Sequence, residues 1–187
     1  MRRSLLVLIT ILSIVVSCNT APESTGRNGV VFKSAAEYND YIVSRQMEVL
    51  AMVDQFAAAS ATSADSAQTV LERSSRITGE YLADLSAMSD YKGDTAFRNA
   101  AVNSFTFYKR IFDNEYKALL DISAKGDSPS EADVQTIQQI TQAVTAEEAV
   151  LDKRFASAQR DFAQKNKLQL ENLNPAVSGE AAPKSQD

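Results

Sequence analysis

The sequence predicts an all-α protein that folds as an antiparallel up-down-up-down four-helix bundle, and three observations predict it. Between residues 34 and 173, apolar residues recur at the three- to four-residue intervals of one helical face. Breaks with helix stop and start chemistry divide this stretch into four segments. The breaks are short, so successive helices are expected to pack antiparallel.

The first helix is predicted to begin at Ser34. Ser34 and Glu37 have the spacing of a capping box, in which a hydroxyl and a carboxylate accept hydrogen bonds from backbone N–H groups of the first turn. An apolar stripe follows on one face: Tyr38, Ile42, Val49, Val53 and Phe56. The stripe fades in the alanine-rich run 57–62, where we expect the helix to end.

The second helix is predicted to begin at Ser63 and to end at the turn formed by residues 92–94. Its apolar stripe consists of Val70, Ser74, Ile77, Tyr81, Leu85 and Met88. Gly93 can take the left-handed conformation that ends many helices, and Lys92 complements the negative helix C-terminus. Asp94 is then expected to cap the third helix.

The third helix holds six of the fourteen aromatic residues: Phe97, Phe105, Phe107, Tyr108, Phe112 and Tyr116. Rings at this spacing are typical of a bundle core, although a pocket for an apolar ligand would need the same stripe. Phe107 lies off the main stripe and is expected to be an exposed contact residue. A second turn of the same type, residues 125–127, is predicted to end this helix.

The fourth helix is predicted to begin with a capping box at Ser128 and Glu131, with Pro129 in the first helical position. Its stripe consists of Val134, Ile137, Val144, Leu151, Phe155, Ala158 and Phe162. Similar helix lengths and short turns favour a closed bundle. An intermolecular coiled coil and a helical repeat array are the alternatives.

The N-terminus carries a cationic start and an apolar run. Arg2 and Arg3 precede the run of residues 5–16, which is shorter than the roughly 20 residues that a bilayer-spanning helix needs. This pattern is typical of an export signal peptide, with the positive charges held on the cytoplasmic side. A short transmembrane anchor is the alternative.

The apolar run leads into the only cysteine of the chain. Val15, Val16 and Ser17 precede Cys18, which places an aliphatic residue three positions before the cysteine and a small residue directly before it. This segment resembles the lipobox of bacterial lipoproteins. The resemblance implies diacylglycerol transfer to the Cys18 sulfur, cleavage before Cys18 and N-acylation of the new terminus. Asn19 follows, where an Asp would favour inner-membrane retention, so the outer membrane is favoured.

These features predict four segments. Residues 1–17 form a lipoprotein signal peptide, and residues 18–33 form a lipidated flexible tether in which residues 30–32 could fold back onto the bundle. Residues 34–173 form the four-helix bundle, and residues 174–187 form a disordered tail. Acyl chains on Cys18 would give stable membrane attachment.

Composition argues against several classes of function. Removal of residues 1–17 leaves 17 basic and 24 acidic residues, a net charge of −7, which argues against nucleic acid as a partner. The chain has no histidine, so a ferritin-like di-metal site cannot form, and zinc would lack its usual ligands. We expect no metal, no cofactor and no enzymatic activity. An all-carboxylate cation site at Glu147, Glu148 and Asp152 is the weaker alternative to a solvated acidic face.

One charged pair falls on two predicted apolar stripes. Arg45 lies between Ile42 and Val49, and Glu148 lies between Val144 and Leu151. Counting residues around the antiparallel turns places Arg45 and Glu148 at a similar height. They are therefore expected to form an interior polar pair that helps to select register, unless each side chain extends to water.

The lipobox, the helix start at residues 37–42 and the all-helical remainder resemble small, uncharacterised surface lipoproteins of Bacteroidota and spirochaetes. The resemblance implies surface exposure and transfers no activity. Our first functional hypothesis is a membrane-tethered, non-enzymatic module that binds an envelope protein or has a structural role. The alternative is a carrier that holds a small apolar ligand between its helices.

Overall fold

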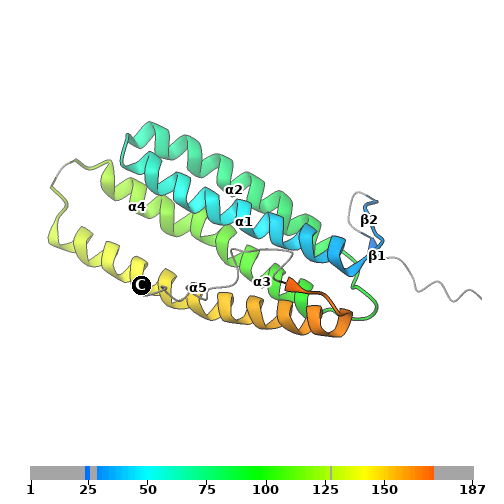
Figure 1. The fold of residues 1–187 in the computed structure, drawn as a ribbon. Coiled ribbons are helices and arrows are strands. Elements are labelled where there is room, and N and C mark those ends of the chain that lie inside the picture. Colours follow the sequence, from blue (N-terminus) through cyan, green and yellow to red (C-terminus); the bar gives the residue numbers. More distant parts are fainter. Residues whose placement is uncertain (1–23, 26–28, 127, 171–187) are drawn as a thin grey trace, which may run out of the picture.

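A computed structural model describes residues 24–25, 29–126 and 128–170 (Figure 1). The predicted signal peptide, the lipobox residues Val15, Val16 and Ser17, and Cys18 all lie outside the described residues, as does the predicted tail. The predicted all-α class is confirmed, because helices account for most of the described chain.

The described helices lie side by side as an elongated body (Figure 1). The elements are β1 (Ser24–Thr25), β2 (Val31–Phe32), α1 (Ala35–Ser60), α2 (Ala64–Ala87), α3 (Ala96–Arg110), η1 (Ile111–Glu115), α4 (Tyr116–Ser123) and α5 (Glu131–Asn166). The π-helical turn η1 joins α3 to α4 without a break in the helix. Helix α1 packs on α2, α2 packs on α3, and α3 packs on α5.

The core lies around α3. Its largest fully buried side chains come from several helices: Tyr38, Ile42, Leu85, Phe97, Phe105, Tyr108, Phe112 and Phe162. Helices α1, α2 and α5 all contact α3, so α3 is buried over a wider face than a helix at the edge. The predicted stripes of the first three helices therefore supply most of this core.

The predicted caps of the first two helices are confirmed. The Ser34 hydroxyl accepts a 3.1 Å hydrogen bond from the Glu37 N–H, and the Ser63 hydroxyl accepts one from the Ser66 N–H. The second half of the first capping box differs, because Glu37 Oε2 accepts from the N–H of Lys33 instead of Ser34. The Glu37 carboxylate thus holds the backbone of Lys33, which precedes the helix, against the first turn of α1.

The turn at residues 92–94 does not cap α2 as predicted. Helix α2 ends at Ala87, and Tyr91 and Asp94 form a β-bridge. Lys92 and Gly93 both have positive φ, at 54° and 83°, the conformation of a two-residue hairpin turn. Asp94 is also not the capping residue of α3 as predicted, because Thr95 holds that position. Asp94 still contributes to the start of α3, since its Oδ1 accepts a 3.0 Å hydrogen bond from the N–H of Ala96, the first residue of the helix.

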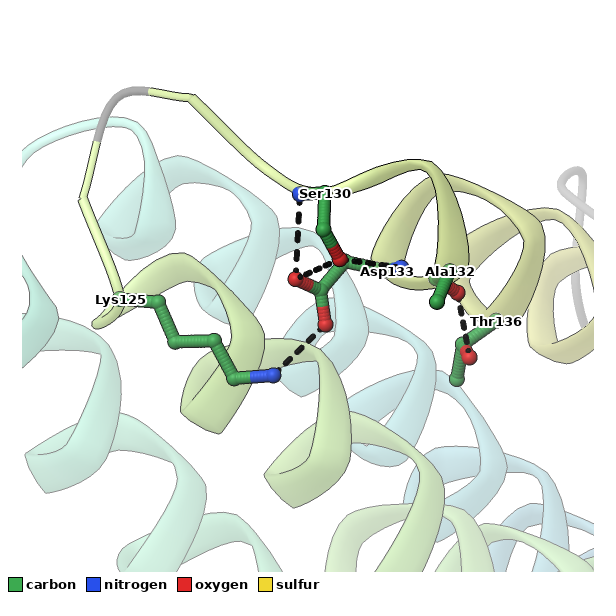
Figure 2. A network of polar contacts seen from close by, with 5 residues as sticks. All are labelled: Lys125, Ser130, Ala132, Asp133 and Thr136. Carbon is green, nitrogen blue, oxygen red and sulfur yellow. Dashed lines mark hydrogen bonds and ion pairs between the residues drawn. The ribbon is translucent and has the colours of Figure 1, made fainter.

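The start of α5 corrects the predicted cap (Figure 2). Ser130, not Ser128, is the capping residue, and its partner is Asp133 instead of Glu131. The Ser130 hydroxyl accepts from the Asp133 N–H at 3.2 Å, and Asp133 Oδ2 accepts from the Ser130 N–H at 3.2 Å. Asp133 also forms an ion pair with the Lys125 ammonium, at 2.6 Å.

The hydrogen bonds at this cap also lower the pKa of the carboxyl group that accepts them. Hydrogen bonds from Lys125 and Ser130 lower the pKa of the Asp133 carboxyl to about 2. Pro129 precedes the helix and does not occupy its first position, so the cap lies two residues later than predicted.

Phe107 is buried, which contradicts its expected exposure. Its side chain is 3% exposed, packs edge-on against Tyr108 and lies under the Arg110 guanidinium. The reason is the central place of α3: neighbours on several sides cover residues outside the stripe that the periodicity defines. The end of the predicted third helix also differs from the prediction. Helix α4 ends at Ser123, and Gly126, which has a φ of 114°, lies beyond this end.

The last helix ends earlier than predicted. Helix α5 stops at Asn166, and Lys167 adopts a left-handed conformation with φ 56°. The N–H of Leu168 then bonds the carbonyl of Ala163 at 2.9 Å, which closes the helix end. The predicted end near residue 173 lies outside the described residues.

The predicted fold-back of residues 30–32 is confirmed for Phe32. Strands β1 and β2 pair antiparallel, and Phe32 is buried edge-on against the rings of Tyr38 and Tyr41. Val30 and Val31 stay exposed. Part of the expected tether is therefore fixed against the start of α1.

Candidate functional site

The structure gives Arg45 and Glu148 different partners, so the predicted ion pair is not formed. The Arg45 guanidinium donates a 3.0 Å hydrogen bond to the Tyr41 carbonyl and lies 3.4 Å from the centre of the Tyr41 ring. The guanidinium also lies 5.2 Å from the centre of the Tyr81 ring. Arg45 is thus a cation held by two aromatic rings between α1 and α2.

Glu148 pairs with a tyrosine instead. The Tyr108 hydroxyl donates a 2.9 Å hydrogen bond to Glu148 Oε1, which joins α3 to α5. Burial raises the pKa of the Tyr108 hydroxyl, and the neighbouring Glu148 carboxylate raises it further. Tyr108 therefore stays protonated and acts as a fixed hydrogen-bond donor at physiological pH.

The predicted acidic cluster on α5 is divided among different partners. The Arg110 guanidinium binds the Glu147 carboxylate at 2.7 Å and also pairs with Glu115, while Glu148 accepts from Tyr108. Burial raises the pKa of the Asp152 carboxyl, with a further contribution from Glu148. Within the described residues, no group of three or more acidic, cysteine or histidine side chains is arranged to hold a metal ion.

Five of the six aromatic residues predicted for the third helix are core residues. Phe97, Phe105, Phe107, Tyr108 and Phe112 are each at most 3% exposed. Their rings contact other rings; for example, Phe97 lies 5.3 Å from both Phe155 and Phe162. The sixth, Tyr116, differs, because it stacks on Phe56 and borders an open hollow.

This hollow belongs to a region where the packing of α1 against α5 is incomplete. The face of α1 toward α5 is identified by Asn39, whose side chain accepts a hydrogen bond from Gln159 of α5. Going along that face at helical spacing, Asn39, Val43 and Gln46 are buried. Further along, Leu50 is 39% exposed, and Val53 and Ala57 are not buried either. The covered face of α1 thus becomes open halfway along the helix.

Helix α5 also changes from a buried face to an exposed one, but its exposure increases towards the N-terminus of the helix. Its core face is buried at Phe162, Gln159, Phe155 and Val144. The stripe then continues to Ile137, which is half-buried, and to Val134, which is 40% exposed. Predicted core residues at the start of the fourth helix are therefore only partly covered.

Helix α4 forms the floor between these two faces. Val53 and Ala57 of α1 and Tyr116 and Leu119 of α4 line a hollow of about 290 Å³. A second hollow of about 480 Å³ lies between Leu119 and Ile137. Leu119 and Ser123 border both hollows, so the two adjoin along α4, and we call them together the distal groove.

The residues that line the distal groove belong to the end of α1, to α4 and to the start of α5. These segments lie at the end of the molecule opposite β1 and β2 (Figure 1). Val53 and Ala57 of α1 and Ile137 of α5 line the walls of the groove, and Tyr116, Leu119 and Ser123 of α4 line its floor. The exposed Leu50 and Val134 lie one helical turn before Val53 and Ile137 and extend the two walls. The side chains that line the groove are apolar except for the hydroxyls of Ser60, Tyr116 and Ser123.

The segments that form the groove are strongly acidic. Residues 46–60, 116–125 and 131–152 contain eight carboxylates and two lysines, a net charge of −6. Both lysines, Lys117 and Lys125, already pair with aspartates. Burial raises the pKa of the Tyr116 hydroxyl to about 12, and the negative charges of Glu148 and Asp54 add to this rise.

Sequence reasoning did not identify this groove. Ile137 belongs to the predicted stripe of the fourth helix, and Leu50 belongs to no predicted stripe. No break in the apolar pattern marks the opening, because Ile140 lies at helical spacing between Ile137 and Val144 and is half-buried. Exposure of these faces depends on which other helices cover them.

Comparisons with protein-family models, with curated proteins and with solved structures find no match to this chain. None of the described helices is both long and apolar enough to cross a membrane.

Proposed function

We propose that this chain is an envelope lipoprotein that is anchored through Cys18 and binds another envelope protein through the distal groove. In this proposal the helices form an up-down-up-down four-helix bundle that is closed near the membrane and open at the far end. The protein has no enzymatic activity of its own, and it is located at the outer membrane and not at the inner membrane.

The observation that carries the proposal is the uncovered end of two core stripes. Leu50 and Val134 are 39% and 40% exposed, whereas Asn39 and Gln159, on the same two faces, are 0% and 2% exposed. Burying apolar surface contributes about 25 cal/mol per Å². A partner that covers the groove would gain this free energy, and contiguous apolar surface of this kind marks interaction sites.

The position of the groove suits a membrane-anchored binding module. Residues 29–33 lead into α1, and α1 extends about 39 Å at 1.5 Å per residue before it ends beside the groove. With an acylated Cys18 at the other end, the groove would face away from the bilayer. A partner in the same compartment could then reach it without contact with lipid.

The titratable groups support a binding role more than a catalytic one. Although partial burial opposes ionisation, the Lys165 ammonium and the Ala96 N–H lower the pKa of Asp94. Lys109 and Ser75 lower the pKa of Asp113 in the same way. These carboxylates lie in ion pairs on the surface, as structural salt bridges do.

The anchor is tested by feeding cells an alkyne analogue of palmitate and detecting label on the wild-type chain and on the Cys18→Ser variant. We expect label and membrane association in the wild type and neither in the variant. Ser17→Thr, which keeps a small residue before the cysteine, is the matched control. A processed N-terminus other than Cys18 would rule out the lipoprotein assignment.

The docking site is tested in cells by placing a photoreactive residue at position 50. We expect a crosslink to one envelope protein from position 50 and none from position 51, because Ala51 is also exposed but lies about 100° around the helix from position 50. Equal crosslinking from both positions would show that the groove has no special role.

One observation favours the alternative of an apolar-ligand carrier. The hollow of about 290 Å³ beside Phe56 and Tyr116 approaches the size of small-ligand pockets. The protein purified from membranes would then retain an extractable apolar compound, detectable by mass spectrometry. The Leu119→Trp variant, which fills the hollow, would release that compound.

A further inference from the structure

We infer that the distal groove takes an amphipathic helix of a partner protein, with lysine or arginine beside its apolar face. This inference rests on the proposed function and adds the chemistry of the partner. Three observations support it: the shape of the groove, its charge, and the poor fit of a second copy of this chain or of its segment 171–187.

The shape fits a helix. The two walls are helix faces and the floor is a third helix, which together offer the surroundings of one more member of a bundle. The uncovered apolar positions repeat at helical spacing, with Leu50, Val53 and Ala57 on one wall and Val134 and Ile137 on the other. A helix of about three turns with apolar residues at i, i+3, i+4 and i+7 would cover these positions.

The charge selects a cationic helix. Residues 46–60 and 131–152, which form the two walls, contain seven carboxylates and no lysine or arginine. Arg110 and Lys125 of neighbouring elements pair with two of these carboxylates. Asp54 is exposed and directly follows Val53 in the α1 wall, and Glu148 of α5 accepts a hydrogen bond from Tyr108 and carries no ion pair in the described structure. Basic residues that flank the apolar face of the partner would meet these carboxylates, which raises the association rate and selects against acidic helices.

Two other occupants fit less well. A second copy of this chain would bring the same acidic walls together, and like charges across an interface oppose association. The segment 171–187 of this chain has three acidic residues and one lysine, so it would also meet like charge. It holds few large apolar residues, chiefly Leu173 and Val177.

The experiment measures peptide binding to the full chain in nanodiscs of zwitterionic phosphatidylcholine, with empty nanodiscs as the blank. The probes are synthetic peptides of about 14 residues with leucine at i, i+3, i+4 and i+7. One peptide has lysine at the flanking positions, a second has glutamate there, and a third is a scrambled lysine peptide. A photoreactive residue at position 50, with position 51 as the control, reports where each peptide binds.

We expect the lysine peptide to bind, to crosslink from position 50 and not from position 51, and to bind more weakly as salt rises. The double variant Asp54→Asn with Glu148→Gln should weaken its binding about tenfold. The glutamate and scrambled peptides should bind at least about tenfold more weakly than the lysine peptide. Circular dichroism checks that the variants keep their helix content.

Each other outcome overturns the inference in a distinct way. Equal binding of the lysine and glutamate peptides at position 50 would overturn the cationic partner but leave a docking groove. A crosslink between two copies without peptide would assign the groove to self-association. If no peptide binds, the inference fails, and the crosslink from position 50 in cells then decides separately whether the proposed function stands.

Discussion

The side-chain amide of Gln159 donates a 2.9 Å hydrogen bond to Asn39 Oδ1 across 120 positions of sequence, and both side chains are buried. This bond holds the C-terminal half of α5 against the start of α1. At the other end of α5, Val134 and Ile137 have no equivalent polar contact with α1 in the described structure. The two ends of the same helix therefore have different roles: one is fixed in the core and the other borders the groove.

The Asn39–Gln159 bond predicts an asymmetry between single and double substitutions. Asn39→Leu should lower the free energy of unfolding by about 1–3 kcal/mol, because it leaves the buried Gln159 amide without its acceptor. Asn39→Leu combined with Gln159→Leu should recover much of this loss, since two apolar groups need no partner. Urea unfolding followed by circular dichroism measures both, with the exposed Gln138→Leu as control. A double variant less stable than the single one would contradict the pairing.

The partners of Glu148 are tested by two double-mutant cycles. Tyr108→Phe and Glu148→Leu should show a coupling of about 0.5–1.5 kcal/mol, because each substitution removes the same hydrogen bond. Arg45→Met and Glu148→Leu should be additive, because Arg45 contacts Tyr41 and Tyr81 instead. Urea unfolding of the six chains gives both values, and coupling in the second cycle would restore the ion pair expected from the sequence.

The buried Tyr38 hydroxyl predicts instability in alkali. Burial raises the pKa of Tyr38 to about 12, with Asp90 and Asp94 adding to the rise against the opposing charge of Arg98. In the unfolded chain the phenol ionises near its ordinary pKa of 10.0. The contribution of Tyr38 to stability is therefore fully present below pH 10 and is lost as the pH rises towards about 12.

The measurement is the urea midpoint of the wild type and of Tyr38→Phe as a function of pH. The variant lacks the hydrogen bond from the Tyr38 hydroxyl to the Ser89 carbonyl, so it should be slightly less stable at neutral pH. Its stability should fall less steeply above pH 10 than that of the wild type. Parallel curves for the two proteins would show that Tyr38 does not titrate on unfolding.

The cap of α5 is tested by two serines two residues apart. Ser130→Ala should cost about 1 kcal/mol of stability, because its hydroxyl satisfies the Asp133 N–H at the helix start. Ser128→Ala should have little effect, although the sequence alone favours Ser128. Amide hydrogen exchange in the first turn of α5 should increase only for Ser130→Ala. The reverse result would move the helix start back to the predicted position.

The sequence predicted what is decided within one turn of helix. The caps at Ser34 and Ser63 need only a hydroxyl three positions before a backbone N–H, and both are observed. The α5 cap was misplaced because Ser128 and Ser130 are locally similar. What separates them is Lys125, a residue beyond the turn that binds Asp133.

Counting residues around the turns did not correctly predict which residues of different helices lie at the same height in the bundle. There are two structural reasons. The 92–94 turn is a hairpin several residues beyond the end of α2, so the count includes residues that are not helical. The π-helical turn η1 then changes the residue-to-angle relation within the third helix, because a π turn holds more residues than an α turn. Both effects help to explain why Glu148 meets Tyr108 and not Arg45.

The sequence by itself determined the helical class, most of the core stripe and the expected lipid attachment at Cys18, because periodicity, caps and signal chemistry are read from neighbouring residues. Only the tertiary structure decided the burial of Phe107, the partner of Glu148 and the opening beside Leu50. Each of these depends on how many helices surround a given face. That number is set by the packing of whole helices against one another, and a periodic pattern within one helix does not contain it.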